Sequence, residues 1–268
     1  MPFITHDGAR ISWREEGQGS PLLLIMGHRW SSAMWYLALP ALAAKHRVVL
    51  FDNRGVGDSD TTRGVTISQM AGDALAVLDA AGIARAHIYG VSMGGGIAQE
   101  VARLAPERVI SLILGCTLYW TPDKPRLPGW LREVLYRLPA PLVQALRGRK
   151  LVAGLYGSAA PADLVAQDLA RIDADKHTRA GVLEQARAMS AYSPPADAAN
   201  AITMPTLVLH GDEDGVVPYA YGVELAKALP DATLVTLPGA GHNYFVAAGK
   251  TADDAVIAFL DRVDRTRA

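Results

Sequence analysis

The sequence predicts an α/β fold in which a mostly parallel, doubly wound sheet carries an N-terminal antiparallel hairpin and a helical insertion. Short continuous apolar runs alternate with segments of helical spacing, a pattern typical of parallel strands covered by helices on both faces. An Asp-Gly pair separates two strand-like runs near the start, which predicts a two-residue hairpin turn. A proline-divided stretch of helical spacing interrupts the alternation in the second half.

The first part of the chain builds the predicted sheet one strand at a time. Asp7-Gly8 joins predicted strands at 3–6 and 9–14. Later apolar runs predict buried strands, and the segments between them have helical periodicity. These strands are 21–26, 48–51, 86–91 and 109–116, and the helices are 34–44, 67–81 and 93–105. Thr66 is a good N-cap for the second helix, and Pro106 stops the third.

The hydrophobic pattern of the chain changes between residues 119 and 202. Six prolines from Pro122 to Pro161 divide this stretch into amphipathic pieces with helical rather than strand spacing. We therefore expect a helical cap at 119–202, inserted into a core domain made of 1–118 and 203–268. The strand and helix alternation then resumes, with strands at 206–209 and 233–237 and helices at 219–228 and 251–263.

Composition and charge narrow the classes of function. Half of the 268 residues are apolar and the net charge is −1, so a large core is feasible and neither nucleic acid nor a membrane surface is an expected partner. The single cysteine, Cys116, ends an apolar run and is expected to be a buried hydrophobe, as in a reducing compartment. With no leader pattern or membrane-spanning run, we expect a cytoplasmic protein acting on a small molecule. The sequence leaves a homo-oligomer open.

The strongest motif is Gly90-Val91-Ser92-Met93-Gly94, which stands between a predicted strand and a predicted helix. At such a turn the serine adopts a strained backbone with positive φ, and the two glycines remove side chains that would collide. The Ser92 hydroxyl then stands clear of the sheet as a nucleophile, and the backbone N–H of Met93 faces a developing oxyanion. A structural serine in a glycine-rich turn is the alternative.

A serine hydroxyl needs a base, and histidine has the appropriate pKa near neutral pH. His242 follows a predicted strand and a tight glycine-containing segment, so its imidazole can reach the edge of the sheet where Ser92 stands. The other candidates are expected to be packed in the core or solvated. They are His46, His87, His177 and His210.

A carboxylate should hold the tautomer of that imidazole. Asp214 lies in the loop after the penultimate predicted strand and is the favoured candidate. Its neighbours Asp212 and Glu213 are expected to point to solvent, and Asp123 is an outside candidate because some related enzymes place the acid there.

The order Ser92, Asp214, His242, together with the elbow and the segments Asp52-Asn53-Arg54-Gly55 and Gly239-Ala240-Gly241-His242, resembles the α/β-hydrolase superfamily. The run Ser92-Met93-Gly94-Gly95 is similar to that of cap-bearing serine hydrolases such as enol-lactonases, polyketide methyl esterases and haloperoxidase-like esterases. The resemblance implies a second oxyanion donor, the backbone N–H of His28. Many members have His-Gly where this chain has Met26-Gly27. This difference leaves open which roles the side chains of His28, Arg29 and Trp30 have.

The resemblance implies an acyl-enzyme reaction on Ser92, cleaving an ester or lactone of a small, largely apolar substrate. Side chains expected to shape the pocket are Arg29, Trp30, Trp120, Trp130, Tyr136, Tyr156 and Tyr192, although each aromatic residue can equally pack the cap onto the sheet. No cofactor or metal is expected, and the glycine-rich loop at 52–60 lacks the lysine of a nucleotide-binding loop.

Three alternatives stay open at this point. A C–C bond hydrolase uses the same triad, but such enzymes commonly have Asn before the serine and Trp after the histidine, where this chain has Val91 and Asn243. An acyl transferase or perhydrolase differs only in the acceptor that replaces water. A receptor or cyclase without hydrolytic activity is the alternative from another class, because fold alone does not fix function.

Overall fold

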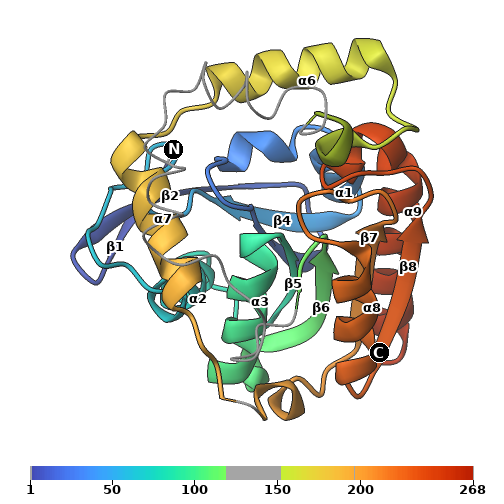
Figure 1. The fold of residues 1–268 in the computed structure, drawn as a ribbon. Helices are drawn as coiled ribbons and strands as arrows, with labels where there is room; N and C mark the ends of the chain where they lie inside the picture. The colour runs from blue at the N-terminus through green and yellow to red at the C-terminus, as the bar shows by residue number, and fades with distance from the viewer. Residues whose placement is uncertain (1, 119–151, 196, 268) are drawn as a thin grey trace.

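The computed structural model describes residues 2–118, 152–195 and 197–267. Its centre is an eight-stranded sheet with the order β1-β2-β4-β3-β5-β6-β7-β8 (Figure 1). The strands are β1 (Phe3–His6), β2 (Ala9–Glu16), β3 (Ser20–Ile25), β4 (His46–Phe51), β5 (Ala86–Val91), β6 (Val109–Gly115), β7 (Thr206–Gly211) and β8 (Ala232–Leu237). This confirms the predicted mostly parallel sheet with an N-terminal antiparallel pair.

The hairpin and the parallel part of the sheet follow from local sequence. His6 pairs with Ala9 across the Asp7-Gly8 turn, and both turn residues have positive φ, as this tight turn requires. β2 pairs antiparallel with β4, and from β4 to β8 every neighbouring pair is parallel. The carboxyl ends of these parallel strands therefore meet at one edge of the sheet.

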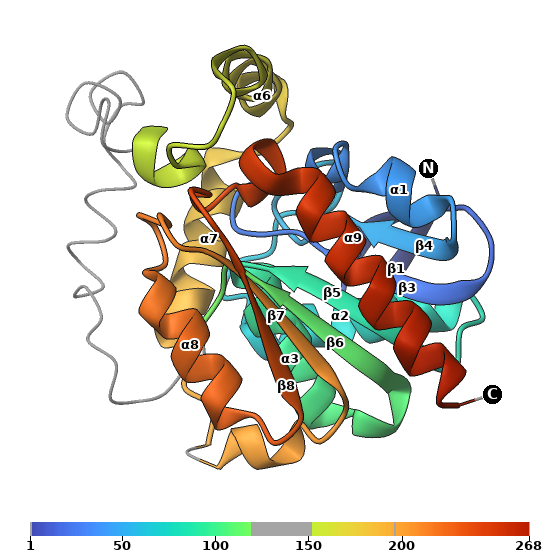
Figure 2. The same cartoon turned by 90° about the vertical axis from the view of Figure 1, so that its right-hand side faces the viewer.

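Helices cover both faces of the sheet (Figure 2). One apolar cluster packs α2 (Ile67–Ala80), α3 (Met93–Leu104) and α8 (Tyr219–Ala228) onto one face. The other cluster packs α1 (Leu39–Ala43) and α9 (Tyr244–Arg265) onto the opposite face. The strands between them are buried on both sides: every residue of β5 is buried, which explains their continuous apolar runs.

Two predicted helices were wrong in extent. The expected helix at 34–44 is a 3-10 turn, η1 (Ser32–Trp35), followed by the short α1, because Pro40 lacks the N–H that a continuous helix needs and stands in the first turn of α1 instead. The closing helix begins at Tyr244 rather than near 251, with a break at Ala248 (φ −136°, ψ 25°) that divides it into two helical pieces.

The segment between β6 and β7 contains the expected helical pieces where the structure describes it. These are α6 (Ala162–Ala174), α7 (Arg179–Ala191) and the 3-10 turn η3 (Ala198–Ala201); a further 3-10 turn, η2 (Pro106–Arg108), precedes β6. Thr178 caps α7 by accepting the Gly181 N–H. The cap boundaries at 119 and 202 stay a prediction, since residues 119–151 lie outside the described part. Within the described residues, no helix combines the length and apolar character needed to cross a membrane.

Candidate active site

Four parallel strands of the sheet, β3, β5, β7 and β8, bring the candidate residues to the same edge, with β6 between β5 and β7. Ser92 directly follows β5, and Gly27 comes just after the neighbouring β3. Asp214 stands in the loop after β7 and His242 in the loop after β8. The order of the strands, rather than proximity in sequence, therefore assembles this site.

The predicted turn at Ser92 is present with the strain that the glycines imply. Ser92 has φ 55° and ψ −119°, between the last residue of β5 and the first residue of α3. A Cβ on Gly90 would lie 2.2 Å from the Gly94 carbonyl oxygen, and a Cβ on Gly94 would lie 2.1 Å from that of Ile25. Both positions therefore require glycine, and the backbone of Ser92 is further held by its N–H bond to Gly115 O (2.9 Å).

Ser92, His242 and Asp214 form one continuous hydrogen-bonded chain. His242 Nε2 lies 3.0 Å from Ser92 Oγ, and His242 Nδ1 lies 2.8 Å from Asp214 Oδ2. A carboxylate only accepts hydrogen bonds, so Nδ1 carries the proton and Nε2 accepts from the Ser92 hydroxyl. His242 is 9% and Asp214 7% exposed, while Ser92 is half-buried and can be reached by a substrate. The geometry is that of a nucleophile with its general base.

Asp214 is held by four donors. Its Oδ1 accepts the backbone N–H groups of Val216 and Val217, both at 2.8 Å. Besides the bond from His242, Oδ2 lies 3.3 Å from His210 Nε2, which also lies 2.9 Å from Val217 O. Burial alone would raise the pKa of Asp214, but the hydrogen bonds from the two histidines outweigh it and hold the pKa below its ordinary value. Asp214 is therefore ionised beside the imidazole.

His210 was expected to be only a core histidine. It is indeed fully buried in β7, but it also contacts the candidate acid. Both groups near its Nε2 are acceptors, which places the ring proton on that nitrogen. Asp212 and Glu213 are exposed, as expected, and bond to Gly239 N–H and to Ser158 respectively.

The loop that carries His242 is fixed by residues from the segment between β6 and β7. Gly154 O accepts both Gly215 N–H (3.0 Å) and His242 N–H (3.1 Å), so one carbonyl joins the loops of the acid and the base. Burial lowers the pKa of the His242 imidazole, whereas the hydrogen bond to the Asp214 carboxylate and the charge of that group raise it, and the net effect is a raised pKa. Cys116 is buried, as predicted.

The loop after β3 lies against the candidate nucleophile. A Cβ on Gly27 would stand 3.2 Å from Ser92 Cβ, so this backbone passes directly beside the serine. Met93 begins α3, which puts its N–H at the helix N-terminus beside Ser92. The side chain of His28 bonds to Val182 O, that of Arg29 is exposed and that of Trp30 packs on the core. These placements put the predicted oxyanion loop next to Ser92.

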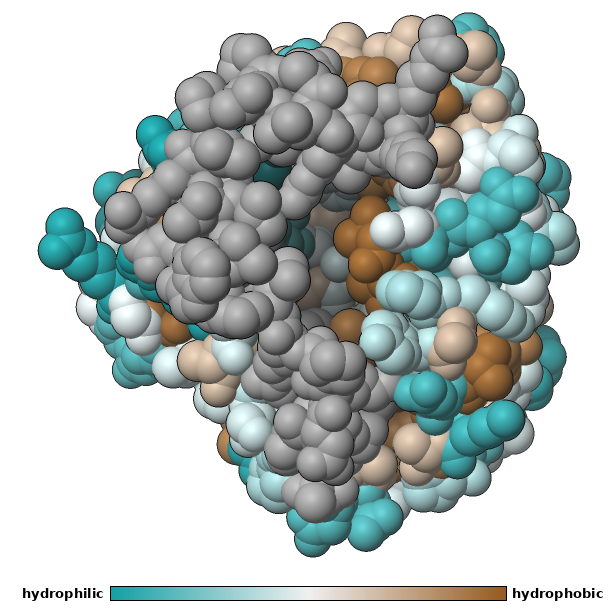
Figure 3. All heavy atoms as spheres, viewed as in Figure 1, coloured by the Kyte–Doolittle hydropathy of each residue, from teal (hydrophilic) through white to brown (hydrophobic). Residues whose placement is uncertain are grey.

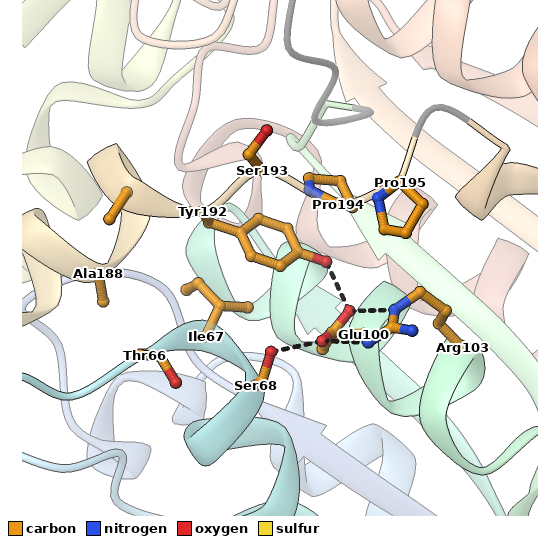
Figure 4. A pocket seen from close by; sticks show the side chains of 11 residues that line it. Thr66, Ile67, Ser68, Glu100, Arg103, Ala188, Tyr192, Ser193, Pro194 and Pro195 are labelled. Atoms are coloured by element: carbon orange, nitrogen blue, oxygen red, sulfur yellow. Dashed lines mark hydrogen bonds and ion pairs between the residues drawn. The ribbon is translucent and has the colours of Figure 1, made fainter.

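The aromatic residues predicted to line the pocket lie in different parts of the structure. Tyr192 donates to Glu100 and lines a separate cavity of about 280 Å³ between α2, α3 and α7 (Figure 4). Ser68 and Arg103 also bond to Glu100, and no member of the Ser92 chain lines this cavity. Tyr156 is buried, with its hydroxyl on Asp168. Trp120, Trp130 and Tyr136, like Asp123, lie outside the described residues.

A buried carboxylate next to the site escaped the sequence analysis. Asp168 of α6 accepts hydrogen bonds from the hydroxyls of Tyr36 and Tyr156 and from Asn243 Nδ2, each at 2.8 Å. Asn243 directly follows His242, so this network joins α6 to the loop of the base. Tyr36 and Asn243 lie far from Asp168 in the sequence, and no sequence spacing signals such contacts.

Chemically, the site offers a nucleophile and a base. Figure 3 shows a hollow on the face viewed in Figure 1, with apolar residues along part of its rim. No group of three or more metal-ligating side chains occurs among residues 2–118, 152–195 and 197–267. The described groups support attack by Ser92 on an electrophilic carbon, with proton transfer to His242.

A family model for the alpha/beta hydrolase fold matches residues 20–247. The chain belongs to the α/β-hydrolase family. A protein of Azorhizobium caulinodans named "Putative carbamate hydrolase RutD" is 29% identical over 99% of this chain and 100% of its own length. The family match agrees with the strand order and helix layers of the structure.

Solved structures of α/β-hydrolases superimpose closely. An enol-lactonase from Burkholderia xenovorans has a TM-score of 0.82 and 25% identity, over 97% of this chain and all of its own. A thermophilic esterase from Thermogutta terrifontis has a TM-score of 0.85 and 25% identity, over 97% of both chains. Together with the family match, these relatives support hydrolase activity for this chain.

Proposed function

We propose that this α/β-hydrolase is a serine esterase or lactonase that cleaves a small, largely apolar carboxylic ester through an acyl-enzyme on Ser92. The observation that carries the proposal is the chain of hydrogen bonds from Ser92 through His242 to Asp214, with 3.0 and 2.8 Å between the paired atoms. The relatives named as an enol-lactonase and an esterase support the reaction class.

In the first half-reaction, Ser92 Oγ attacks the carbonyl carbon and its proton passes to His242 Nε2. The carbonyl oxygen becomes an oxyanion, which the backbone N–H groups of Met93 and His28 stabilise. Asp214 stabilises the imidazolium that forms. Collapse of the tetrahedral intermediate breaks the bond to the alcohol oxygen, and this oxygen takes the proton from Nε2.

In the second half-reaction, water replaces the alcohol. His242 Nε2 accepts a proton from the water while the water oxygen attacks the acyl carbon. The imidazolium then returns that proton to Ser92 Oγ as the bond between Oγ and the acyl carbon breaks and the acid leaves. For a lactone, the acid and the alcohol remain in one product molecule. No step needs a group that the chain does not itself supply, apart from water.

Turnover of short-chain and medium-chain p-nitrophenyl esters and of a simple lactone tests the proposal. The proposal expects ester and lactone hydrolysis in the absence of added metal or cofactor, with saturation kinetics. Tight binding of a small apolar ligand without turnover of any ester would contradict it and would favour a receptor. Preferential acyl transfer to an added alcohol or peroxide, over hydrolysis, would instead assign a transferase or perhydrolase.

The pH profile should report the raised pKa of His242. Protonated His242 cannot accept the Ser92 proton, so kcat/KM rises with pH as the imidazole deprotonates. Because the Asp214 carboxylate stabilises the imidazolium and the net effect on this pKa is a rise, we expect the midpoint above the ordinary histidine value of about 6.5. Initial rates of ester hydrolysis from pH 5 to pH 10 measure it. A flat profile would contradict the assignment of a histidine base.

A further inference from the structure

Helix α7 lies directly on the two loops that follow β3 and β4, and glycines make this contact possible. A Cβ on Gly55 would lie 2.5 Å from the Cα of Gly181, and a Cβ on Gly181 would lie 2.2 Å from Gly55 O. Any side chain at either position would separate the helix from the loop. The first half of α7 is therefore seated against backbone, with no layer of side chains between.

Gln185 of α7 joins the two loops through both ends of its amide. Its Oε1 accepts the Arg29 N–H at 2.8 Å, and its Nε2 donates to Arg54 O at 2.8 Å. Only this orientation of the amide matches a donor with an acceptor at each end. The residue is 0% exposed, so neither bond is exchanged for water and losing either would leave a buried polar group unsatisfied.

The Arg29 bond acts on the backbone beside the proposed oxyanion donor. Arg29 has φ 76°, a conformation that costs free energy for a residue other than glycine and that needs support from its surroundings. One turn before Gln185 on the same helix, Val182 O accepts a hydrogen bond from His28 Nε2 at 2.9 Å. Successive residues of the loop are thus bound to successive turns of α7.

We propose that Gln185 is a positioning residue for ester hydrolysis: from α7 it holds the loop of Gly27, His28 and Arg29 in the geometry that stabilises the oxyanion. This inference rests on the proposed function. It makes α7 a fixed part of the catalytic apparatus rather than a lid. Oxyanion stabilisation depends on donors held about 2.7 to 3.1 Å from the position of the developing charge, so releasing Arg29 lowers kcat even though Gln185 does not touch the substrate.

The test compares Gln185→Met and Gln185→Glu with wild type. Methionine has a similar volume and neither donor nor acceptor, whereas glutamate keeps an acceptor for the Arg29 N–H. We expect kcat to fall about tenfold or more in Gln185→Met, with KM within about threefold, because full loss of an oxyanion donor costs about 100- to 1,000-fold. Gln185→Glu should retain more activity than Gln185→Met. Glu184→Gln is the matched control, since Glu184 is the neighbouring buried residue but bonds to Gly64 N–H instead.

Inhibition by a trifluoromethyl ketone distinguishes positioning from partial unfolding. The ketone carries the acyl chain of the ester and forms a tetrahedral oxyanion on Ser92, so its inhibition constant in Gln185→Met should rise by the same factor as kcat/KM falls. A variant that is merely partly unfolded shows fewer titratable sites with an unchanged inhibition constant, which would overturn the inference. Wild-type kcat in a folded Gln185→Met protein would overturn it as well. Failure of the wild type to hydrolyse esters would instead reject the proposed function.

Discussion

Ser92→Ala reduces ester turnover by at least about 1,000-fold, because it removes the hydroxyl whose proton His242 Nε2 accepts. Alanine keeps the Cβ and meets the same backbone strain at φ 55°, so the fold should survive the substitution. Steady-state hydrolysis of p-nitrophenyl butyrate measures the loss, and thermal unfolding checks the fold.

Ser68→Ala is the matched control for this variant. Ser68 donates to Glu100 in the separate cavity of Figure 4, so its loss should leave turnover close to wild type. Wild-type turnover by Ser92→Ala would mean that catalysis takes place elsewhere in the chain. Equal losses in both variants would point to an effect on folding rather than on chemistry.

Asp214→Asn lowers kcat by about 10,000-fold, the loss seen when a triad acid is replaced by its amide. The asparagine oxygen would take the two N–H groups that Asp214 Oδ1 now accepts, which leaves the NH₂ group facing His242 Nδ1. His242 would then carry its proton on Nε2 and could not accept one from Ser92. The residual activity should rise at lower pH than in wild type, because the carboxylate that raises the pKa of His242 is gone.

Asp212→Asn is the control for the acid. Asp212 is exposed and accepts the Gly239 N–H, which an asparagine oxygen can also accept, so its kinetics should match wild type. A loss of only a few fold in Asp214→Asn would contradict the role of Asp214. A large loss in Asp212→Asn would show that the two carboxylates had been assigned the wrong way round.

The turn at Ser92 could be predicted from sequence because the motif that marks it is local. A Cβ on Gly90 would meet the Gly94 carbonyl within the turn, whereas the contact that requires Gly94 is with Ile25 of the neighbouring strand β3. Asp214 and His242 could be predicted because parallel strands deliver their following loops to one edge. The single helix predicted at 34–44 was wrong because the prediction used only the spacing of apolar residues. That spacing takes no account of Pro40, which lacks the N–H that a continuous helix needs at this position.

Contacts between distant segments could not be predicted in the same way. Gln185 reaches Arg29 across 156 residues, and Asp168 reaches Asn243 across 75. Both are polar residues on amphipathic helices, where the pattern indicates a solvated side chain. His210 was predicted to be a core residue because it lies within a buried strand, and its contact with Asp214 depends on how the following loop folds back. The substrate pocket stays a prediction where it depends on residues 119–151.

Labelling with a fluorophosphonate, followed by intact mass measurement, tests the activation of Ser92 most directly. Wild type should gain the mass of one probe rapidly, His242→Ala should react far more slowly, and Ser92→Ala should not react. This outcome is expected because only a serine whose proton passes to a base attacks the phosphorus at a useful rate. Labelling of folded wild type no faster than of Ser92→Ala would contradict the account, since the hydrogen bonds from Ser92 to Asp214 would then not make a nucleophile.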